Sequence, residues 1–501
     1  MNYDEALRYL DRHINLEKTG ATAGKVEGLT LEPMLRLMDV LGEPQRAYPV
    51  IHITGTNGKG STARMVADLL AAHGLRVGLY TSPHLRDVNE RLWFSGDPLV
   101  RVDDDGEVFE AVSSQGKRAI HEARDEMVSD ADLIGLDEED VSIKLSEEWA
   151  RSRVVEASDG RPAGPISDDE LAAVLTEVSE LAPLAGITPS YFELCTAAAF
   201  VWFAQLPVDV AVVEVGLLGR YDATNVVDAL VAVVTNIGQD HTDFEGDWRG
   251  NIAREKAGIV KDGSFLVLGE PDAELRPIFE AAVGHDPNRI WVVGEDFEAQ
   301  GNQVAVGGRL VDVRTPGGLL DGLFVPAHGE HQGVNAALAI AAVEAFFARP
   351  LEAEVAQAGF MRTRLAARFE IVGRSPLIVV DGAHNPDGAA TVLETLNEDF
   401  DVIGRRILVI GMLAGRDPEQ FLDAVGVRTA DLVIACTPPS PRALDAAVVA
   451  RTAEALGTPA EVVADVADAI ERARAVAAEE DVVVITGSLY TAGAALRALD
   501  P

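Results

Sequence analysis

The sequence predicts a two-domain α/β protein, and three features carry that prediction. The chain has 501 residues, which is enough for two or three domains with complete hydrophobic cores. A glycine-rich loop separates a short apolar run from a helical pattern near residue 55. From about residue 376 onward, apolar runs alternate with helical patterns, as in a parallel sheet covered by helices. We therefore expect a first domain over residues 1–368 and a Rossmann-like α/β domain over 369–501.

The glycine-rich loop predicts phosphate binding. A buried strand is expected at Val50–Ile53 and a helix from Ser61 to His73, because the apolar residues follow strand and helix spacing. Between them, the segment Gly-Thr-Asn-Gly-Lys-Gly-Ser (55–61) allows backbone N–H groups to point inward at a helix N-terminus, which suits a phosphate. Lys59 supplies a positive charge for the β- and γ-phosphates, and Ser61 supplies a hydroxyl for Mg²⁺. A glycine-rich turn without a ligand is the alternative, and the strand–loop–lysine–helix order argues against it.

The other elements of the first domain are predicted from hydrophobic periodicity. Residues 97–167 are acidic and lack sustained apolar patterns, so we expect a solvated insertion with some helix there. The remaining expectations are helices within 1–45 (the second at Leu31–Leu41), Glu170–Leu181, Tyr191–Gln205 and Gly333–Phe347, strands Val77–Tyr80, Val208–Val215 and Leu230–Asn236, and a β-rich region over 265–325 with short strands Ile290–Val293 and Val304–Val306.

Composition narrows the classes of function. The formal net charge is −39, from 81 acidic and 42 basic residues, and only seven of the basic residues are lysines. An acidic, lysine-poor surface predicts adaptation to a salt-rich cytoplasm and argues against nucleic-acid binding. Two cysteines, Cys195 and Cys436, cannot form a disulfide framework and are expected in the core. The absence of a secretory signal pattern and of long apolar runs predicts a cytoplasmic, non-membrane protein.

Three polar residues follow predicted strands and form a candidate metal site. Ser82, Glu214 and His241 each stand at or just beyond the carboxyl end of a strand, where ligands collect in open α/β sheets. Together with Ser61 they offer hydroxyl, carboxylate and imidazole groups for two Mg²⁺ ions. A lone histidine in such a place is more often structural, but the neighbouring acidic residues Asp240 and Asp243 favour the metal role.

Lys256 is a candidate for covalent modification. An exposed helical lysine is the ordinary interpretation, but its retention in a chain with so few lysines is suggestive. A buried lysine with a lowered pKa can react with CO₂ to give a carbamate, which would turn a cation into a metal-binding anion.

An ordered set of motifs then points to one family. The chain contains Gly-Thr-Asn-Gly-Lys-Gly-Ser (55–61), Thr-Ser-Pro-His-Leu (81–85), Tyr-Phe-Glu (191–193), Glu-Val-Gly-Leu-Leu-Gly-Arg-Tyr-Asp-Ala-Thr-Asn (214–225), Asp-His-Thr-Asp (240–243), Arg-Glu-Lys-Ala-Gly-Ile (254–259), Ala-Arg-Phe-Glu (367–370) and Asp-Gly-Ala-His-Asn-Pro (381–386). Together they resemble folylpolyglutamate synthase/dihydrofolate synthase, the folate branch of the Mur ligase superfamily. The resemblance covers nearly the whole chain except residues 97–167, and it implies that residues 1–368 form a Mur-type ATPase domain and 369–501 the glutamate ligase domain.

The resemblance implies a role for each matched residue. Lys59, His241 and Lys256 would be catalytic, with Lys256 carbamylated, and Asn335 would meet the adenine. The leucine at Leu218 departs from the family pattern, which usually has glycine there. The other implied sites are ATP at Asn57, Gly58, Lys59, Gly60, Ser61, Arg368, Asp381 and His384, two Mg²⁺ at Ser61, Ser82, Glu214 and His241, and the pterin substrate at Ser190, Tyr191, Phe192, Glu193, Tyr221, Asp222 and Ala223.

The implied reaction is ATP-dependent amide formation between a pteroate or folate acid and L-glutamate, through an acyl phosphate, in a monomer that closes between its domains. The sequence does not decide whether the acceptor of glutamate is dihydropteroate, tetrahydrofolate or both. One alternative is a Mur-type ligase with a non-folate acceptor, which would keep the ATP and Mg²⁺ residues but not Tyr191, Phe192 and 222–225. A second alternative is a nucleotide-dependent regulatory binding protein, which would need neither His241 nor Lys256.

Overall fold

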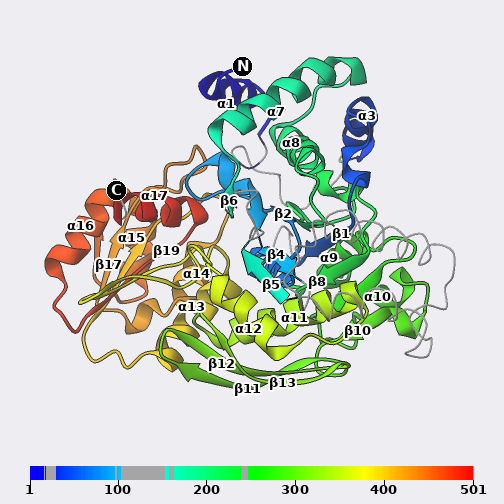
Figure 1. Ribbon diagram of the computed structural model, residues 1–501. Coiled ribbons are helices and arrows are strands. Elements are labelled where there is room, and N and C mark those ends of the chain that lie inside the picture. The colour runs from blue at the N-terminus through cyan, green and yellow to red at the C-terminus, as the bar shows by residue number, and fades with distance from the viewer. Residues whose placement is uncertain are drawn as a thin grey trace.

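The computed structural model describes residues 1–15, 17, 30–95, 99–102, 153–156, 163–238 and 246–499. Two large β-sheets organise this part of the chain, and helices cover both faces of each (Figure 1). The first sheet belongs to the N-terminal three quarters of the chain, and the second belongs to residues from 370 onward.

The first sheet has eight strands, and its middle is parallel. In spatial order the strands are β10 (Ile290–Val292), β9 (Phe265–Leu268), β8 (Val231–Val234), β1 (Val50–Thr54), β7 (Val210–Glu214), β2 (Val77–Tyr80), β3 (Leu92–Ser95) and β6 (Gly164–Pro165). β10 to β2 run parallel, β3 pairs antiparallel with β2, and β6 pairs antiparallel with β3. Every residue of β1, β7, β8 and β2 is buried, which explains their near-continuous valine and isoleucine content.

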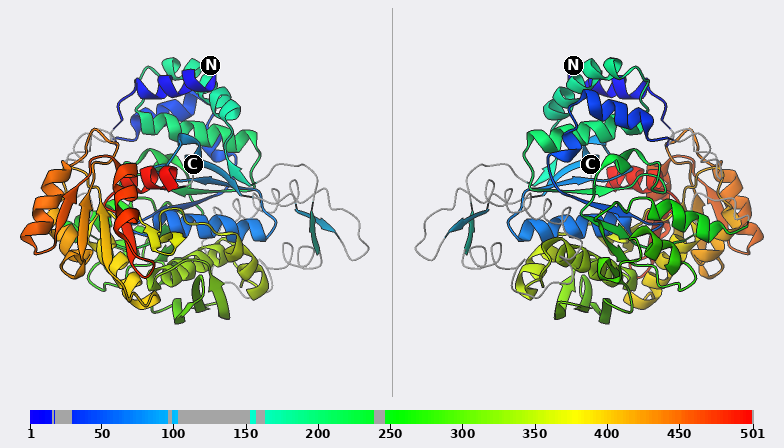
Figure 2. Two further views of the ribbon diagram at one scale, coloured as in Figure 1. Left: turned by 90° about the vertical axis from the view of Figure 1, so that its left-hand side faces the viewer. Right: turned by 90° about the vertical axis from the view of Figure 1, so that its right-hand side faces the viewer.

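Helices close both faces of this sheet. One face packs against α4 (Lys59–Ala72), α11 (Glu330–Phe347) and α12 (Ala353–Arg362), and the antiparallel sheet β11 (Glu298–Ala305), β12 (Gly308–Thr315) and β13 (Gly318–Val325) lies outside those helices. The opposite face carries α1 (Tyr3–Asp11), α3 (Glu32–Val40), α7 (Asp168–Leu181) and α8 (Tyr191–Gln205), which form the cap at the top of Figure 2, together with α9 (Trp248–Ala257) and α10 (Arg276–Ala282). α8 is apolar on all sides and is accordingly buried within the cap.

The second sheet has six strands in the order β14 (Glu370–Arg374), β15 (Leu377–Val380), β19 (Val482–Thr486), β16 (Arg406–Ile410), β17 (Leu432–Ala435) and β18 (Ala460–Val462). One face packs on α13 (Pro386–Asp399), α14 (Pro418–Ala424) and α15 (Ala446–Ala455), and the other packs on α16 (Val466–Val476) and α17 (Leu489–Leu499). Short 3₁₀ turns occur at Pro44–Arg46, Val88–Arg91, Ala182–Ala185, Ala223–Val226, Pro287–Arg289 and Val427–Thr429.

The predicted α/β class is confirmed, and three details differ. The second sheet is not purely parallel, because β14 pairs antiparallel with β15 at its edge. The strand expected at 304–306 is instead the longer β11, and Val306 is a fully exposed turn residue of the β11–β12 hairpin. Within 97–167, β4 (Leu99–Val102) and β5 (Arg153–Glu156) form an antiparallel pair that was not predicted, and the helix expected there falls outside the described residues.

The two cysteines lie in the core, as predicted. Cys195 is buried in α8 and Cys436 is buried just after β17, and neither is in a disulfide. Burial raises the pKa of each thiol to about 12, so neither is a reactive thiolate near neutral pH. Of the helices that the structure describes, none combines the length and the apolar character needed to cross a membrane.

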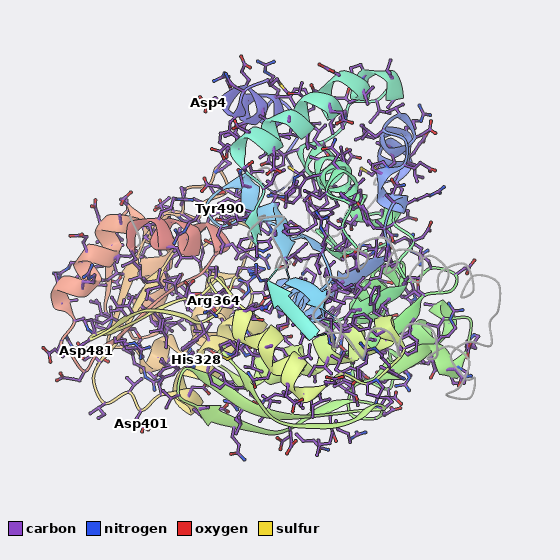
Figure 3. All side chains as sticks on the ribbon, in the orientation of Figure 1. Asp4, His328, Arg364, Asp401, Asp481 and Tyr490 are labelled. Carbon is purple, nitrogen blue, oxygen red and sulfur yellow. The ribbon has the colours of Figure 1, made fainter. Side chains whose placement is uncertain are left out.

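A buried ion pair ties the two α/β units together. Arg309 on β12 donates from Nη1 to Asp399 Oδ1 over 2.6 Å, and both side chains are almost fully buried. Asp399 is the last residue of α13, where the helix dipole disfavours a carboxylate. The buried negative charge of Asp399 therefore depends on Arg309 and its other hydrogen-bond partners for stabilisation. Its other oxygen accepts from the backbone N–H of Gly329 and faces His328. His328, labelled in Figure 3, packs its ring against Phe400 at 4.9 Å.

Removal of the Arg309 guanidinium is expected to destabilise the protein strongly. Arg309→Ala leaves the Asp399 carboxylate buried without its cation, and such a loss costs about 3–5 kcal/mol in the free energy of unfolding. Arg472→Ala is the matched control, because the Arg472–Glu461 pair is exposed and should contribute little. Urea unfolding followed by circular dichroism measures both, and equal shifts for the two variants would contradict the assignment.

Candidate active site

The phosphate loop has the backbone that its glycines predict. It leaves β1 at Thr54 and enters α4 at Lys59, with Gly55 at φ +152° and Gly58 at φ +83°. A Cβ at Gly55 would lie 1.7 Å from Thr235 Oγ1, and one at Gly58 would lie 2.6 Å from Asn335 Oδ1. Both positions therefore require glycine, for steric and conformational reasons together.

Contacts from the two residues that follow β8 hold the loop in place. Asn236 Oδ1 accepts from the backbone N–H groups of Thr56 at 3.1 Å and Asn57 at 2.9 Å. Thr235 donates from Oγ1 to the Asn57 carbonyl at 2.6 Å. The Lys59 ammonium donates to the carbonyls of Gly55 and Thr56 at 3.0 and 3.1 Å, so it sits at the mouth of the loop. The loop is thus preorganised around the place where its N–H groups and Lys59 would meet phosphate oxygens.

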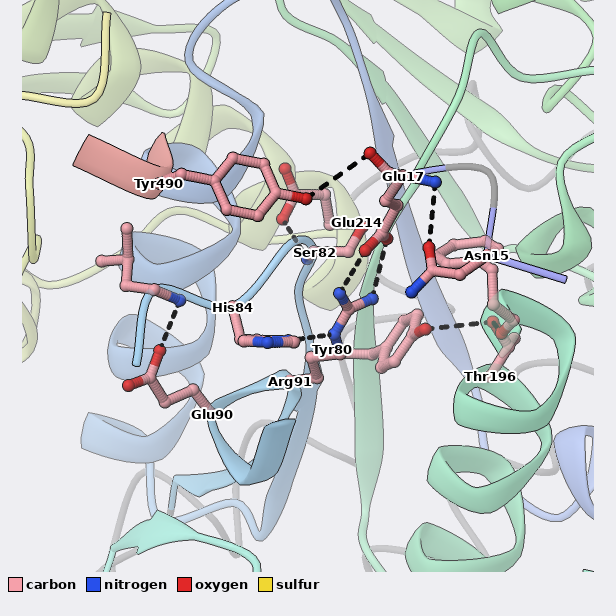
Figure 4. Close-up of polar contacts among 12 residues, drawn as sticks. Asn15, Glu17, Tyr80, Ser82, His84, Glu90, Arg91, Thr196, Glu214 and Tyr490 are labelled. Carbon is pink, nitrogen blue, oxygen red and sulfur yellow. Dashed lines mark hydrogen bonds and ion pairs between the residues drawn. The ribbon is translucent and has the colours of Figure 1, made fainter. Parts of the chain in front are cut away.

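A buried carboxylate stands beside the first turn of α4. Glu214 ends β7, and its Oε2 accepts from the Ser82 backbone N–H at 3.1 Å (Figure 4). A Cβ at Gly60 would lie 3.5 Å from the same carboxylate, which places Glu214 next to Gly60 and to the buried Ser61. Burial raises the pKa of Glu214, and the nearby charge of Lys59 opposes that rise. Hydroxyl and carboxylate oxygens in this arrangement suit a hard divalent cation.

Of the predicted metal ligands, Ser61, Ser82 and Glu214 converge, whereas His241 lies outside the described residues. The described part of its segment ends at Gly238, where a Cβ would lie 3.3 Å from Thr56 Cγ2 and 2.8 Å from Asp387 Oδ2. The segment that carries His241 therefore starts between the phosphate loop and the second sheet. In the ranges that the structure describes, no cluster of three or more histidine, cysteine or acidic side chains forms a metal site by itself.

Residues of the second unit approach the phosphate loop. Asn385, the N-cap of α13, donates from Nδ2 to Asn57 Oδ1 at 3.2 Å. Asp381 is partly buried and accepts from the backbone N–H groups of Phe369 and Ala383, both at 2.7 Å. Burial raises its pKa, against the opposing charge of Arg368. The predicted ATP ligands of the second domain thus stand at the same edge as the loop.

The segment that carries Arg368 has an unusual backbone. Ala367 and Phe369 on either side both adopt positive φ, at +52° and +49°. Glu370 accepts from the Ala367 N–H, and Asp381 accepts from the Phe369 N–H, so side chains hold the segment in this shape. Strained, over-determined backbone of this kind is common at functional sites, and it fixes the direction of Arg368.

The structure describes three other predicted site residues, but their contacts do not indicate which ligand they would bind. Lys256 is buried near the end of α9, where a Cβ at Gly219 would lie 3.1 Å from its Cα. Asn335 lies on α11 beside Gly58 and donates to Gln332, so it borders the phosphate loop. His384 contacts the Gly382 carbonyl through Nδ1 at 3.0 Å.

The residues at the start of α8 that are predicted to bind the pterin substrate divide into two kinds. Ser190 and Glu193 form a capping box, with the backbone N–H of each bonded to the other's side chain, which is a structural role. Tyr191 is buried and Phe192 is partly buried. A Cβ at Gly216 would lie 2.4 Å from the tip of the Phe192 ring, so this ring rests on the loop that follows Glu214.

That loop also carries Tyr221, Asp222 and Ala223. Asp222 is buried and accepts from the backbone N–H groups of Leu217 at 2.7 Å and Thr224 at 3.0 Å. Tyr221 is exposed, whereas Ala223 is buried. Leu218, the expected departure from the family pattern, adopts φ +58°, which lies in the left-handed region that favours glycine.

The sequence reasoning missed Arg91, which is fully buried close to this site. Its guanidinium bonds both carboxylate oxygens of Glu17 and donates from Nε to His84 Nδ1 at 2.9 Å (Figure 4). It also lies 5.5 Å from the Tyr191 ring centroid. Because arginine only donates, His84 must accept through Nδ1 and is neutral. Tyr490 of α17 approaches the Glu17 carbonyl at 3.5 Å. No local sequence signal marks Arg91, because its partner Glu17 is 74 residues away.

Family models match two parts of the chain. Residues 184–343 match the Mur ligase middle domain, and residues 367–489 match the Mur ligase glutamate ligase domain. Among curated proteins, the chain is similar to dihydrofolate synthase/folylpolyglutamate synthase of Mycobacterium tuberculosis. The two are 36% identical over 487 residues, which cover 92% of this chain and 88% of that relative.

Solved structures agree with the sequence comparison. Mycobacterium tuberculosis folylpolyglutamate synthase complexed with ADP has a TM-score of 0.80 and 31% identity, with 100% of this chain and 98% of that chain covered. The bifunctional folylpolyglutamate synthase/dihydrofolate synthase of Yersinia pestis, complexed with AMPPNP and a manganese ion, has a TM-score of 0.74 and 26% identity, with coverage of 100% and 98%.

Replacement of Leu218 by glycine is expected to stabilise the protein. A non-glycine residue in the left-handed region costs about 1–2 kcal/mol, and glycine removes that cost but gains entropy in the unfolded state. We therefore expect Leu218→Gly to raise the free energy of unfolding by roughly 0.5–1 kcal/mol. Thermal melting measures the change, with Leu217→Gly as the control that should destabilise. A lower melting temperature for Leu218→Gly would show that the leucine side chain contributes more than its backbone costs.

Proposed function

The chain belongs to the dihydrofolate synthase/folylpolyglutamate synthase family of Mur ligases, and on that premise we propose that it joins L-glutamate to a pterin-bearing carboxylic acid in an ATP-dependent reaction. One structural observation supports this proposal above others. The phosphate loop, the Glu214 carboxylate and the segments of Arg368 and Asn385 gather at the carboxyl edge of four adjacent parallel strands. Ligands of open α/β sheets bind at this edge.

The first half-reaction is transfer of the γ-phosphoryl group to the acceptor carboxylate, which gives an acyl phosphate and ADP. Both reactants are anionic, so their approach needs fixed positive charge and aligned N–H groups rather than a side-chain nucleophile. Lys59 and the backbone of residues 55–60 supply these groups. The amine of glutamate then attacks the acyl carbon, an amide bond forms, and inorganic phosphate leaves.

A divalent cation fits the residues present. Glu214 is a buried carboxylate beside Ser61 and the Ser82 segment, and burial makes an uncompensated charge there unfavourable. We infer that Ser61, Ser82, Glu214 and His241 hold two Mg²⁺ ions. When bound, such ions supply positive charge that offsets the repulsion between carboxylate and triphosphate. The buried position of Lys256 is compatible with its carbamylation, which would add a further anionic ligand.

The second domain is proposed to complete the site by closure. Asp381 stands on it, Arg368 directly precedes it, and the bond from Asn385 to Asn57 already links it to the phosphate loop. We infer that residues 1–368 and 369–501 are the two bodies that move, that Asn335 meets the adenine, and that His384 is near the phosphates. All these groups belong to one chain, so we take the acting unit to be a monomer, and we keep the cytoplasm, expected from the sequence, as its proposed location.

The acceptor is proposed to bind between the start of α8 and the loop after β7. Phe192 and the Asp222 loop lie against each other through Gly216, and Tyr191 flanks them. An aromatic ring beside a buried carboxylate suits a flat heterocycle that carries N–H donors. The non-folate Mur ligase and the regulatory binding protein are both less favoured, because the relatives that share the full length of the chain are named as folate enzymes.

The decisive test is product analysis. The purified chain with ATP, Mg²⁺ and L-glutamate in high KCl is expected to add a glutamyl residue to dihydropteroate, tetrahydrofolate or both, as seen by mass spectrometry. Lys59→Met should lower turnover by roughly 10²–10³-fold, because it removes a fixed charge from the transferring phosphoryl group. Arg36→Met on the surface of α3 is the control and should leave turnover unchanged. If neither acid is glutamylated by the wild-type chain, the proposal is wrong.

The acidic surface generates a separate expectation. We infer that the formal net charge of −39 is tolerated because the protein works in concentrated salt, where repulsion is screened beyond about 3 Å at 1 M. The melting temperature should therefore rise steadily as KCl increases from low to molar concentration. Differential scanning fluorimetry measures it, with sucrose as the uncharged control. A melting temperature that is highest in dilute buffer would rule out this adaptation.

A further inference from the structure

His52 is a buried polar residue that takes no part in the phosphate loop or in the candidate metal site. It lies in the middle of β1, fully buried, three residues before Gly55. Burial lowers the pKa of its imidazole to about 3, and the charge of Lys261 acts in the same direction, so the ring is neutral. A neutral imidazole in an apolar strand is costly unless its N–H finds a partner.

The partner is Thr224, and the contact continues to Asp222. His52 Nε2 lies 2.9 Å from Thr224 Oγ1, and Thr224 donates its hydroxyl hydrogen to Asp222 Oδ1 in a short hydrogen bond. A hydroxyl has one hydrogen, which is used on the carboxylate, so its oxygen must accept from His52. The imidazole therefore carries its hydrogen on Nε2. Its Nδ1 is buried and has no hydrogen-bond partner among the described residues, which agrees with a bare ring nitrogen.

Two side chains of β1 hold the loop after β7, which carries Asp222. His52 reaches Thr224, and Thr54 donates from Oγ1 to the Leu218 carbonyl at 2.6 Å. Residues two apart in a strand point to the same face, so both contacts are made by one side of β1. The strand that leads into the phosphate loop thus also fixes the loop that carries Asp222.

We propose that His52 is a positioning residue for the acceptor: through Thr224 it holds the Asp222 carboxylate in the orientation that receives the pterin ring. This inference rests on the proposed function, since it takes Asp222 to face the acceptor. Without the imidazole donor, the Thr224 hydroxyl can rotate away, and Asp222 Oδ1 then keeps only the Thr224 backbone N–H of its two partners. The affinity for the acceptor then falls, while the phosphate loop keeps its own contacts from Asn236 and Thr235.

Steady-state kinetics of matched variants test the proposal. His52→Leu should raise the KM for the pterin acid about tenfold, the loss expected for one buried hydrogen bond, with the KM values for ATP and glutamate within twofold of wild type. His52→Gln, whose amide N–H can replace Nε2–H, should restore the KM for the acid to within about threefold. Thr224→Val should match His52→Leu, and the double variant should add nothing, because both break the same chain of contacts.

A stability control and a direct measurement accompany the kinetics. Ile51→Val, on the same strand, loses core packing without touching Thr224 and should leave all three KM values unchanged. Long-range ¹H–¹⁵N spectra of the wild-type chain, assigned with His52→Gln, should show His52 as the Nε2–H tautomer without titration between pH 5 and 8. This measurement does not depend on the folding of any leucine variant.

The results of these experiments distinguish a failure of the positioning role from a failure of the proposed function. Turnover by the wild-type chain with an unchanged acid KM in His52→Leu, or a His52 resonance with its hydrogen on Nδ1, overturns the positioning role and leaves the proposed function intact. A parallel rise of all three KM values equally overturns it, because that pattern reports general damage. A wild-type chain that glutamylates neither dihydropteroate nor tetrahydrofolate overturns the proposed function and, with it, the role of His52.

Discussion

The structure depends on one constraint, which is that the backbone between β1 and α4 must pass within contact distance of β8 and α11. At Gly55 and Gly58 even a single methyl group would overlap Thr235 or Asn335. Asn236 then satisfies two consecutive N–H groups of the loop from the neighbouring strand. The conformation of this loop is therefore set by tertiary packing as well as by the local glycines.

The parallel order of strands β8, β1, β7 and β2 turns that constraint into a site. Parallel strands end at one edge of the sheet, so segments distant in the chain meet there: the phosphate loop after β1, Glu214 at the end of β7 and Ser82 just beyond β2. The unit built on the second sheet approaches the same edge through Asn385. Phosphoryl transfer needs positioned charge above all, and this arrangement provides it without a nucleophilic side chain.

Much of the fold and of the candidate site was predictable because the sequence patterns that indicate them are local. The strand–loop–helix unit from β1 to α4 follows from glycine spacing and apolar periodicity, and α8 begins and ends at the predicted residues because its apolar run is long and capped. β11 was mostly missed because Glu298–Gln303 has little intrinsic strand preference, and pairing with β12 makes it a strand. Arg91 and His52 were missed for a related reason, since each is defined by a partner at least 74 residues away in the chain.

The Asp399 carboxylate at the end of α13 has a mechanical consequence. Arg309, Gly329 and His328 surround it in a buried contact, whereas at the other end of α13 Asn385 meets Asn57 through a hydrogen bond of 3.2 Å. Neighbouring rings, with Phe369 stacked on Phe400 at 5.4 Å, stiffen the first of these contacts further. Of these two contacts the buried Asp399 pair is the more costly to break, so a separation of the two halves is expected to start at Asn57.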